Sequence, residues 1–130
     1  MSMAKSSSST GSGSPGPSSA GGLLTPQSTA TQNWYAWNDL IPPGPPSFHI
    51  VGDVQVPNPG VDVFLVEIYP QGVSSQTIDL ELIYAQQPGI WPQHVVVKHV
   101  TFEKYRAVYT RAKVYFGTTV IADLPVVNIV

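Results

Sequence analysis

Alternating apolar and polar positions run through most of the chain after about residue 46 and predict β-strands. In residues 77–85, Ile78, Leu80, Leu82 and Tyr84 fall on one face and polar side chains on the other. Residues 105–116 alternate in the same way. Further strands are expected over residues 47–56, 61–69, 94–103, 119–124 and 126–130, separated by turn signals such as Pro-Asn-Pro-Gly at 57–60 and Gly-Thr at 117–118.

Closely spaced strands without an amphipathic helix define the expected fold class. Six or seven strands, separated by turns every eight to twelve residues, are typical of an antiparallel β-sandwich or a small barrel. We expect an all-β antiparallel sandwich with immunoglobulin- or fibronectin-like architecture. Architecture of this kind carries no function with it.

The first part of the chain has a different composition. Residues 1–32 are mostly Ser, Thr, Gly, Pro and Ala, which predicts a disordered tail or spacer. Its serine run at 6–9 is an alternative phosphorylation platform. Residues 33–130 are expected to form a single domain.

Targeting signals are not visible in the sequence. Residues 1–22 lack the apolar core of a signal peptide, and no run of eighteen apolar residues occurs. A cytoplasmic location is therefore the default expectation.

Charge and cysteine content exclude several classes of function. The 130 residues contain no cysteine, which excludes disulfides, thiolate metal sites and cysteine nucleophiles. Residues 33–130 hold five basic and eight acidic residues, a net charge of −3. That sign disfavours nucleic acid and anionic membranes as partners, because both attract clustered lysine and arginine.

No catalytic, metal or cofactor site is expected from the remaining polar residues. His94 and His99 lie an odd number of positions apart on one predicted strand and so face opposite ways, while His49 belongs to another strand. Asp79 and Glu81 share an outward face, where Arg111 and Lys113 are their expected cross-strand partners. An enzyme would need a histidine to meet a carboxylate in one pocket, so we expect a non-catalytic protein.

Aromatic residues outside the clearest strands are the best candidates for a binding site. Trp34, Tyr35, Trp37 and Trp91 form this group. Exposed rings would stack on sugars or cradle a peptide, whereas buried rings would close the ends of the domain. A carbohydrate-binding module therefore predicts at least two exposed, coplanar indoles.

A proline-rich segment follows the first aromatic residues. Residues 41–46, Ile-Pro-Pro-Gly-Pro-Pro, predict an extended crossing with few backbone donors. The alternative is that they are themselves a ligand for an aromatic groove on another protein. The apolar C-terminal residues 125–130 suggest a module of a longer protein or an open sheet edge. We therefore expect an interaction or structural module that binds another protein or self-associates through a sheet edge, with carbohydrate binding as the alternative.

Overall fold

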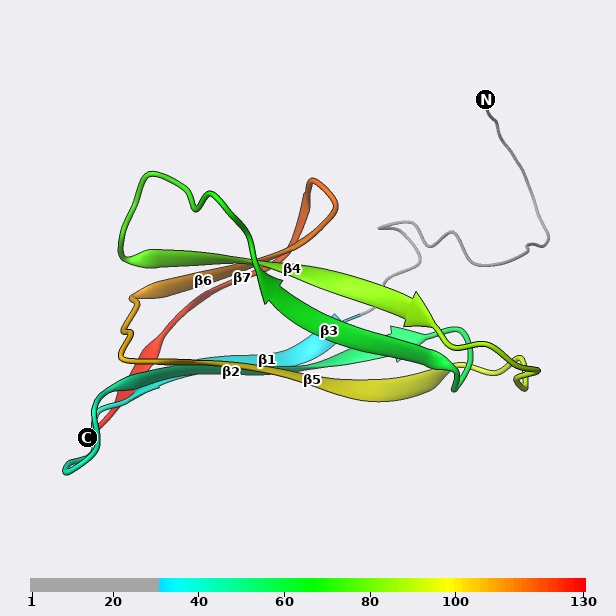
Figure 1. Ribbon diagram of the computed structural model, residues 1–130, viewed down its shortest axis with the longest axis horizontal. Helices are drawn as coiled ribbons and strands as arrows, with labels where there is room; N and C mark the ends of the chain where they lie inside the picture. The colour runs from blue at the N-terminus through cyan, green and yellow to red at the C-terminus, as the bar shows by residue number, and fades with distance from the viewer. Residues whose placement is uncertain (1–30) are drawn as a thin grey trace.

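The computed structural model describes residues 31–130, which form eight strands in two four-stranded sheets (Figure 1). The strands are β1 (Thr31–Asp39), β2 (Ser47–Val56), β3 (Val61–Glu67), β4 (Thr77–Gln86), β5 (Val96–Tyr105), β6 (Arg111–Phe116), β7 (Thr119–Pro125) and β8 (Val127–Ile129). No helix occurs among these residues, so the prediction of an all-β fold is confirmed. The described residues accordingly contain no helix long and apolar enough to cross a membrane.

The structure has more strands than the six or seven predicted. The additional strand is β1, which contains the first aromatic residues. It begins at Thr31, so two residues assigned to the predicted tail belong to the sheet. The rest of the predicted tail lies outside the described residues.

Sheet A has the strand order β5-β2-β1-β8, and sheet B has the order β3-β4-β6-β7. Four of the pairings are antiparallel, but β1 pairs with β8 and β4 pairs with β6 in parallel. The expectation of antiparallel pairing throughout is therefore wrong. The parallel pairs arise because the chain leaves sheet B after β4, forms β5 in sheet A, and returns as β6 in the direction of β4. β8 enters sheet A in a similar way, after Pro125 ends the ladder of β7.

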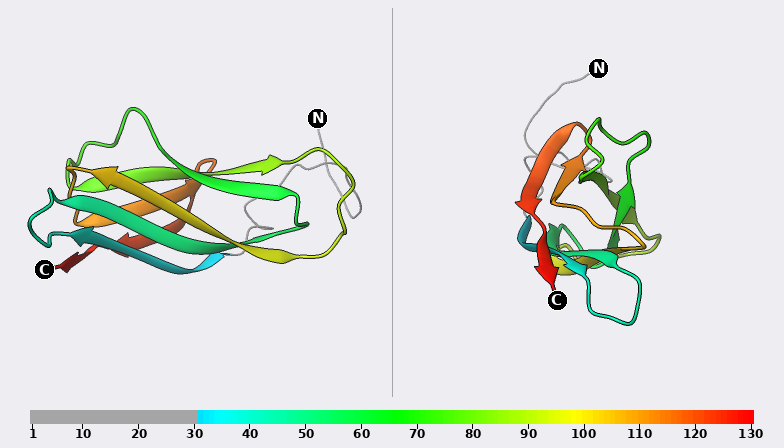
Figure 2. Two further views of the ribbon diagram at one scale, coloured as in Figure 1. Left: turned by 60° about the horizontal axis from the view of Figure 1, so that its bottom comes forward. Right: turned by 90° about the vertical axis from the view of Figure 1, so that its left-hand side faces the viewer.

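The core lies between the two sheets, which form two layers in Figure 2. Inward side chains of both sheets supply it, and the largest fully buried ones are Phe48, Ile50, Val54, Val56, Ile78, Leu80, Leu82 and Val114. The predicted inward face of β4 is confirmed, since its first three apolar residues are buried and Tyr84 packs against the core. The Phe48 ring meets the Tyr109 ring edge-on at 5.2 Å, which is a favourable aromatic geometry.

Two lysines connect the sheets where the edge strands β3 and β5 lie next to each other. Lys104 of β5 places Nζ 2.9 Å from Oε2 of Glu67 on β3. Lys98, also on β5, donates to the Pro59 carbonyl at 2.9 Å and lies 3.5 Å from Asp62. Charged side chains at inward positions of an edge strand hinder the addition of another strand. This side of the domain is therefore protected against edge-to-edge association.

Candidate functional site

Strand β1 divides its side chains between the core and the outer face of sheet A. Trp34, Ala36 and Asn38 point inward, whereas Tyr35 and Trp37 point outward. The pairing register of β1 with β2 shifts between Gln32 and Tyr35, where Asn33 has a φ of 59°. Asparagine tolerates this left-handed conformation better than most residues. Beyond this irregularity the strict alternation of β1 sets which aromatic ring reaches solvent.

Three rings stack on the outer face of sheet A, and we call Tyr35, Trp37 and His49 the ring stack. The centroids of Tyr35 and Trp37 are 5.4 Å apart with their planes at 28°. Trp37 lies opposite His49 in the register of β1 with β2, and their rings are 5.1 Å apart at 10°. Tyr35 remains 45% exposed. Trp37 is half-buried and the His49 side chain is 18% exposed, so the ring stack spans two neighbouring strands with Tyr35 as its most accessible ring.

Polar groups fix the histidine at one end of the ring stack. The Ser47 hydroxyl lies 2.8 Å from Nε2 of His49, and Glu103 of β5 lies 3.8 Å from its Nδ1. Because Glu103 is 58% exposed, its carboxylate is available to solvent beside the rings. The ring stack thus ends in an acidic group that a cationic partner could approach.

A second polar row crosses the same face further along the strands. Asn33 donates to Oδ2 of Asp53 at 2.8 Å, and the other carboxylate oxygen of Asp53 contacts Nδ1 of His99. The hydrogen bond from Asn33, followed by the contact with His99, lowers the pKa of Asp53. Asp53 borders a depression of only about 30 Å³, and the His99 side chain is 82% exposed. This pair lies on an open surface with room for about one water molecule.

The other sequence-predicted polar residues are distributed more widely. His94 precedes β5 and lies outside it, so the predicted placement of His94 and His99 on one strand is wrong. In sheet B the register puts Asp79 beside Lys113, as predicted, whereas Arg111 forms its ion pair with Asp123 at 2.6 Å. No group of three histidine or acidic side chains within residues 31–130 is arranged to hold a metal ion.

Trp34 lies on the opposite face of β1 from the ring stack. Its ring packs so closely over Gly52 that a Cβ at this position would be 2.4 Å from Cε3 of the indole. The Trp34 Nε1 is buried and has no hydrogen-bond partner within residues 31–130. Trp34 is consequently a packing residue of the sheet interior.

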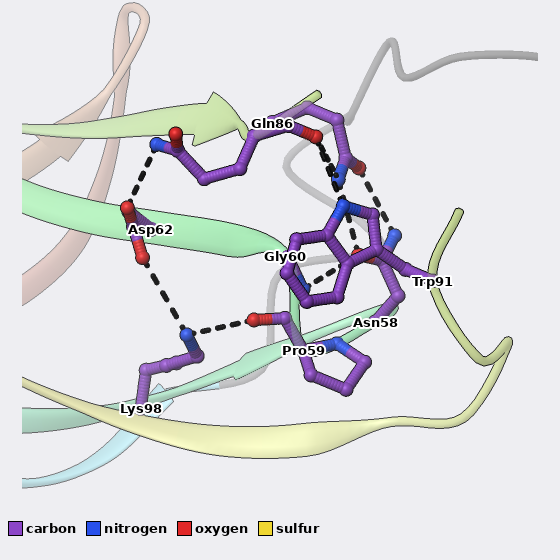
Figure 3. Close-up of polar contacts among 8 residues, drawn as sticks. Asn58, Pro59, Gly60, Asp62, Gln86, Trp91 and Lys98 are labelled. Atoms are coloured by element: carbon purple, nitrogen blue, oxygen red, sulfur yellow. Dashed lines mark hydrogen bonds and ion pairs between the residues drawn. The ribbon is translucent and has the colours of Figure 1, made fainter. Parts of the chain in front are cut away.

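Trp91 covers one end of the domain, in the loop between β4 and β5 (Figure 3). Its ring lies over Gly60, where an added Cβ would be 2.3 Å from the indole, and its Nε1 donates to the Gln87 carbonyl at 3.0 Å. Nearby, the side-chain amides of Asn58 and Gln86 bond to each other, with donor–acceptor distances of 3.0 and 3.2 Å. The four aromatic residues predicted as a site therefore occupy three places, and only Tyr35 and Trp37 come together.

A larger hollow lies at the other end of the domain, at the junction of β1, β8 and the loop before β6. Its volume is about 360 Å³, within the range of small-molecule sites. Buried Asn38 donates to the Tyr109 carbonyl at 2.8 Å and to Oδ1 of Asn128 at 2.9 Å, and accepts from the Tyr109 amide at 3.1 Å. These bonds engage every polar atom of the Asn38 side chain, and they tie β1 to its neighbour β8 and to the loop that leads from β5 to β6. The hollow thus contains no charged side chain and its one buried amide is already saturated.

Sequence reasoning missed two members of the outer-face site, His49 and Glu103. Their role depends on the register of β1, β2 and β5, which brings Trp37, His49 and Glu103 into one row across sheet A. No local sequence pattern carries that register. Comparison with protein-family models, with curated proteins and with solved structures finds no match.

Proposed function

We propose that this chain is a non-catalytic interaction module, a β-sandwich of immunoglobulin- or fibronectin-like architecture, that binds a partner through the outer face of sheet A. The observation that carries the proposal is the ring stack of Tyr35, Trp37 and His49 on the outer face of sheet A, where Tyr35 is exposed and the other two rings are half-buried. Aromatic residues are enriched where proteins bind partners, because they offer large contact area at low entropic cost.

Folding alone does not account for these rings. The core between the sheets is filled by inward side chains, and the ring stack lies on the opposite face of β1 and β2. Sequences depart from the polar-outward pattern mainly where function requires it. The flanking carboxylate of Glu103 and the Asp53–His99 pair add charged groups that would orient a partner.

Carbohydrate binding is the second candidate function, and the adjacent Tyr35 and Trp37 rings favour it. Trp34 and Trp91 each pack on a glycine away from this surface. Because Tyr35 and Trp37 stack on each other, the ring faces they share are closed to a sugar. A glycan would have to lie along the ring edges or on the free end of the stack. Self-association through a sheet edge, predicted from the C-terminal residues, stays a prediction.

Nuclear magnetic resonance can test the proposal through the side-chain indole signals of the three tryptophans, assigned with single Trp→Phe variants. Titration with proline-rich peptides and with a panel of soluble glycans should shift the Trp37 signal and leave that of Trp34 in place. The opposite outcome has two parts. No ligand shifts the Trp37 indole signal, and the double variant Tyr35→Thr with Trp37→Thr loses more than about 3 kcal/mol of unfolding free energy. The rings would then be packing residues and the proposal would be wrong.

A further inference from the structure

The turn that joins β1 to β2 is an exposed proline-rich segment. It contains Ile-Pro-Pro-Gly-Pro-Pro at residues 41–46, all of them exposed. In Figures 1 and 2 this turn projects beyond the strand ends and out from sheet A, on the side that faces away from sheet B. The ring stack lies on that same side. One hairpin therefore presents both an aromatic surface and an apolar, donor-poor segment.

Proline-rich segments and exposed aromatic rings are complementary ligands. Proline has no backbone donor and little conformational entropy to lose, so aromatic-lined surfaces bind it readily. Within one copy the turn leaves β1 after Asp39 and returns at Ser47, and its residues 41–46 are all exposed. A second copy can supply the missing half of the contact.

We propose that two copies of this chain associate through the outer faces of sheet A about a two-fold axis, so that the proline turn of each copy covers the ring stack of the other. The proposal rests on the proposed function, since it names the partner of the same face. Two-fold symmetry makes both contacts identical and closes the assembly as a dimer.

The charges beside the two features are also complementary. Arg106 is tied to the turn, because its backbone amide donates to the Pro46 carbonyl at 2.8 Å, and it is exposed. Glu103 is the exposed carboxylate at the histidine end of the ring stack. A turn that covers the ring stack of the other copy brings Arg106 toward that copy's Glu103. The proposal uses the face of sheet A rather than the edge at β5, where Lys98 and Lys104 occupy inward positions.

Analytical ultracentrifugation of the full chain over a dilution series tests the association with two variants. The stack variant, Tyr35→Thr with Trp37→Thr, keeps the turn, and the turn variant, Pro45→Ser with Pro46→Ser, keeps the rings. Each should weaken dimerisation by about tenfold or more. The matched control, Pro88→Ser with Pro92→Ser, changes two exposed prolines of another loop and should dimerise like the wild type.

An equimolar mixture of the two variants provides the decisive measurement. The stack variant supplies an intact turn and the turn variant supplies intact rings, so a mixed dimer retains one of the two contacts. The mixture should associate more strongly than either variant alone, which a general loss of folding would not produce. The dimer proposal is wrong if the wild type stays monomeric at its highest soluble concentration. It is also wrong if the mixture associates no more strongly than either variant alone.

Failure of the dimer can be separated from failure of the binding face by the Trp37 indole signal. If the wild type is monomeric but a glycan or an unrelated proline-rich peptide shifts Trp37, the second copy is the wrong occupant and the face is the right site. If the wild type is monomeric and no ligand shifts Trp37, both proposals are wrong. A peptide of residues 39–47 should shift Trp37 in the turn variant and not affect the stack variant.

Discussion

Replacing Asn38 with leucine should cost about 3 kcal/mol of unfolding free energy. Asn38 is only 3% exposed, and its side chain bonds the amide and the carbonyl of Tyr109, with Asn128 as a third partner. Leucine keeps a similar shape but leaves both Tyr109 backbone groups without this partner, at about 1–3 kcal/mol for each buried group. Since Tyr109 is only partly buried, we take the lower half of that range for each. Asn128 is exposed and can bond to water, so it adds little.

Urea denaturation of the full chain, followed by circular dichroism, measures this loss. For the approximately 100 residues described, a loss of 3 kcal/mol corresponds to a fall in Tm of about 12–24 °C. Asn128→Leu is the control, because it removes one exposed partner and should cost less than about 1 kcal/mol. A loss below about 1 kcal/mol for Asn38→Leu would show that water replaces the amide and that Asn38 does not anchor the loop before β6.

Two further predictions concern packing and pH. Gly52→Ala should lose about 1–3 kcal/mol in the same assay, because its Cβ would displace the Trp34 ring, whereas Gly44→Ala, with no atom within 4 Å of its new Cβ, should be close to neutral. Hydrogen bonds to the Tyr109 hydroxyl and to a carboxylate of β3 raise the pKa of Lys104 above its ordinary 10.5, so the folded state holds this proton more tightly than the unfolded chain. Stability should therefore fall as the pH rises above 10.5, and Lys104→Met should flatten that decline; an equal slope in both proteins would contradict the assignment.

Local alternation predicted the strands that have one clearly apolar face. Residues 77–85 show the expected inward side chains, because burial there alternates with a period of two. The strand predicted over residues 105–116 is correct only from Arg111 onward, since β5 ends at Tyr105 and residues 106–110 form the connection to β6. Strand β1 was not predicted, since Trp34, Tyr35 and Trp37 obscure its alternation when all three rings are counted as apolar. The parallel pairs were also missed, because they depend on how the chain crosses between sheets and no neighbouring residues encode that crossing.

The candidate site was predictable only in part, for a related reason. Composition pointed to the aromatic residues, and Tyr35 and Trp37 do lie together on the outer face of sheet A. A shift of one position along β1 places Trp34 on the other face, over the glycine that leaves room for its ring. His49 joins the ring stack through cross-strand register alone. Residue type therefore identified candidates, and three-dimensional pairing decided which of them share a surface.

The two faces of β1 make different contacts, so one strand can test both the stability of the domain and the proposed binding face. Inward Asn38 holds the strand to the loop before β6, whereas its outward neighbour Trp37 contributes to a surface outside the core. Asn38→Leu should thus lower unfolding free energy and leave the response of Trp37 to ligands intact wherever the protein is still folded. Tyr35→Thr with Trp37→Thr should remove binding at a smaller cost in stability, because threonine also favours strands. If instead both changes reduced stability and binding together, the outer rings would belong to the folding unit, and the interaction face would have to be sought elsewhere on the domain.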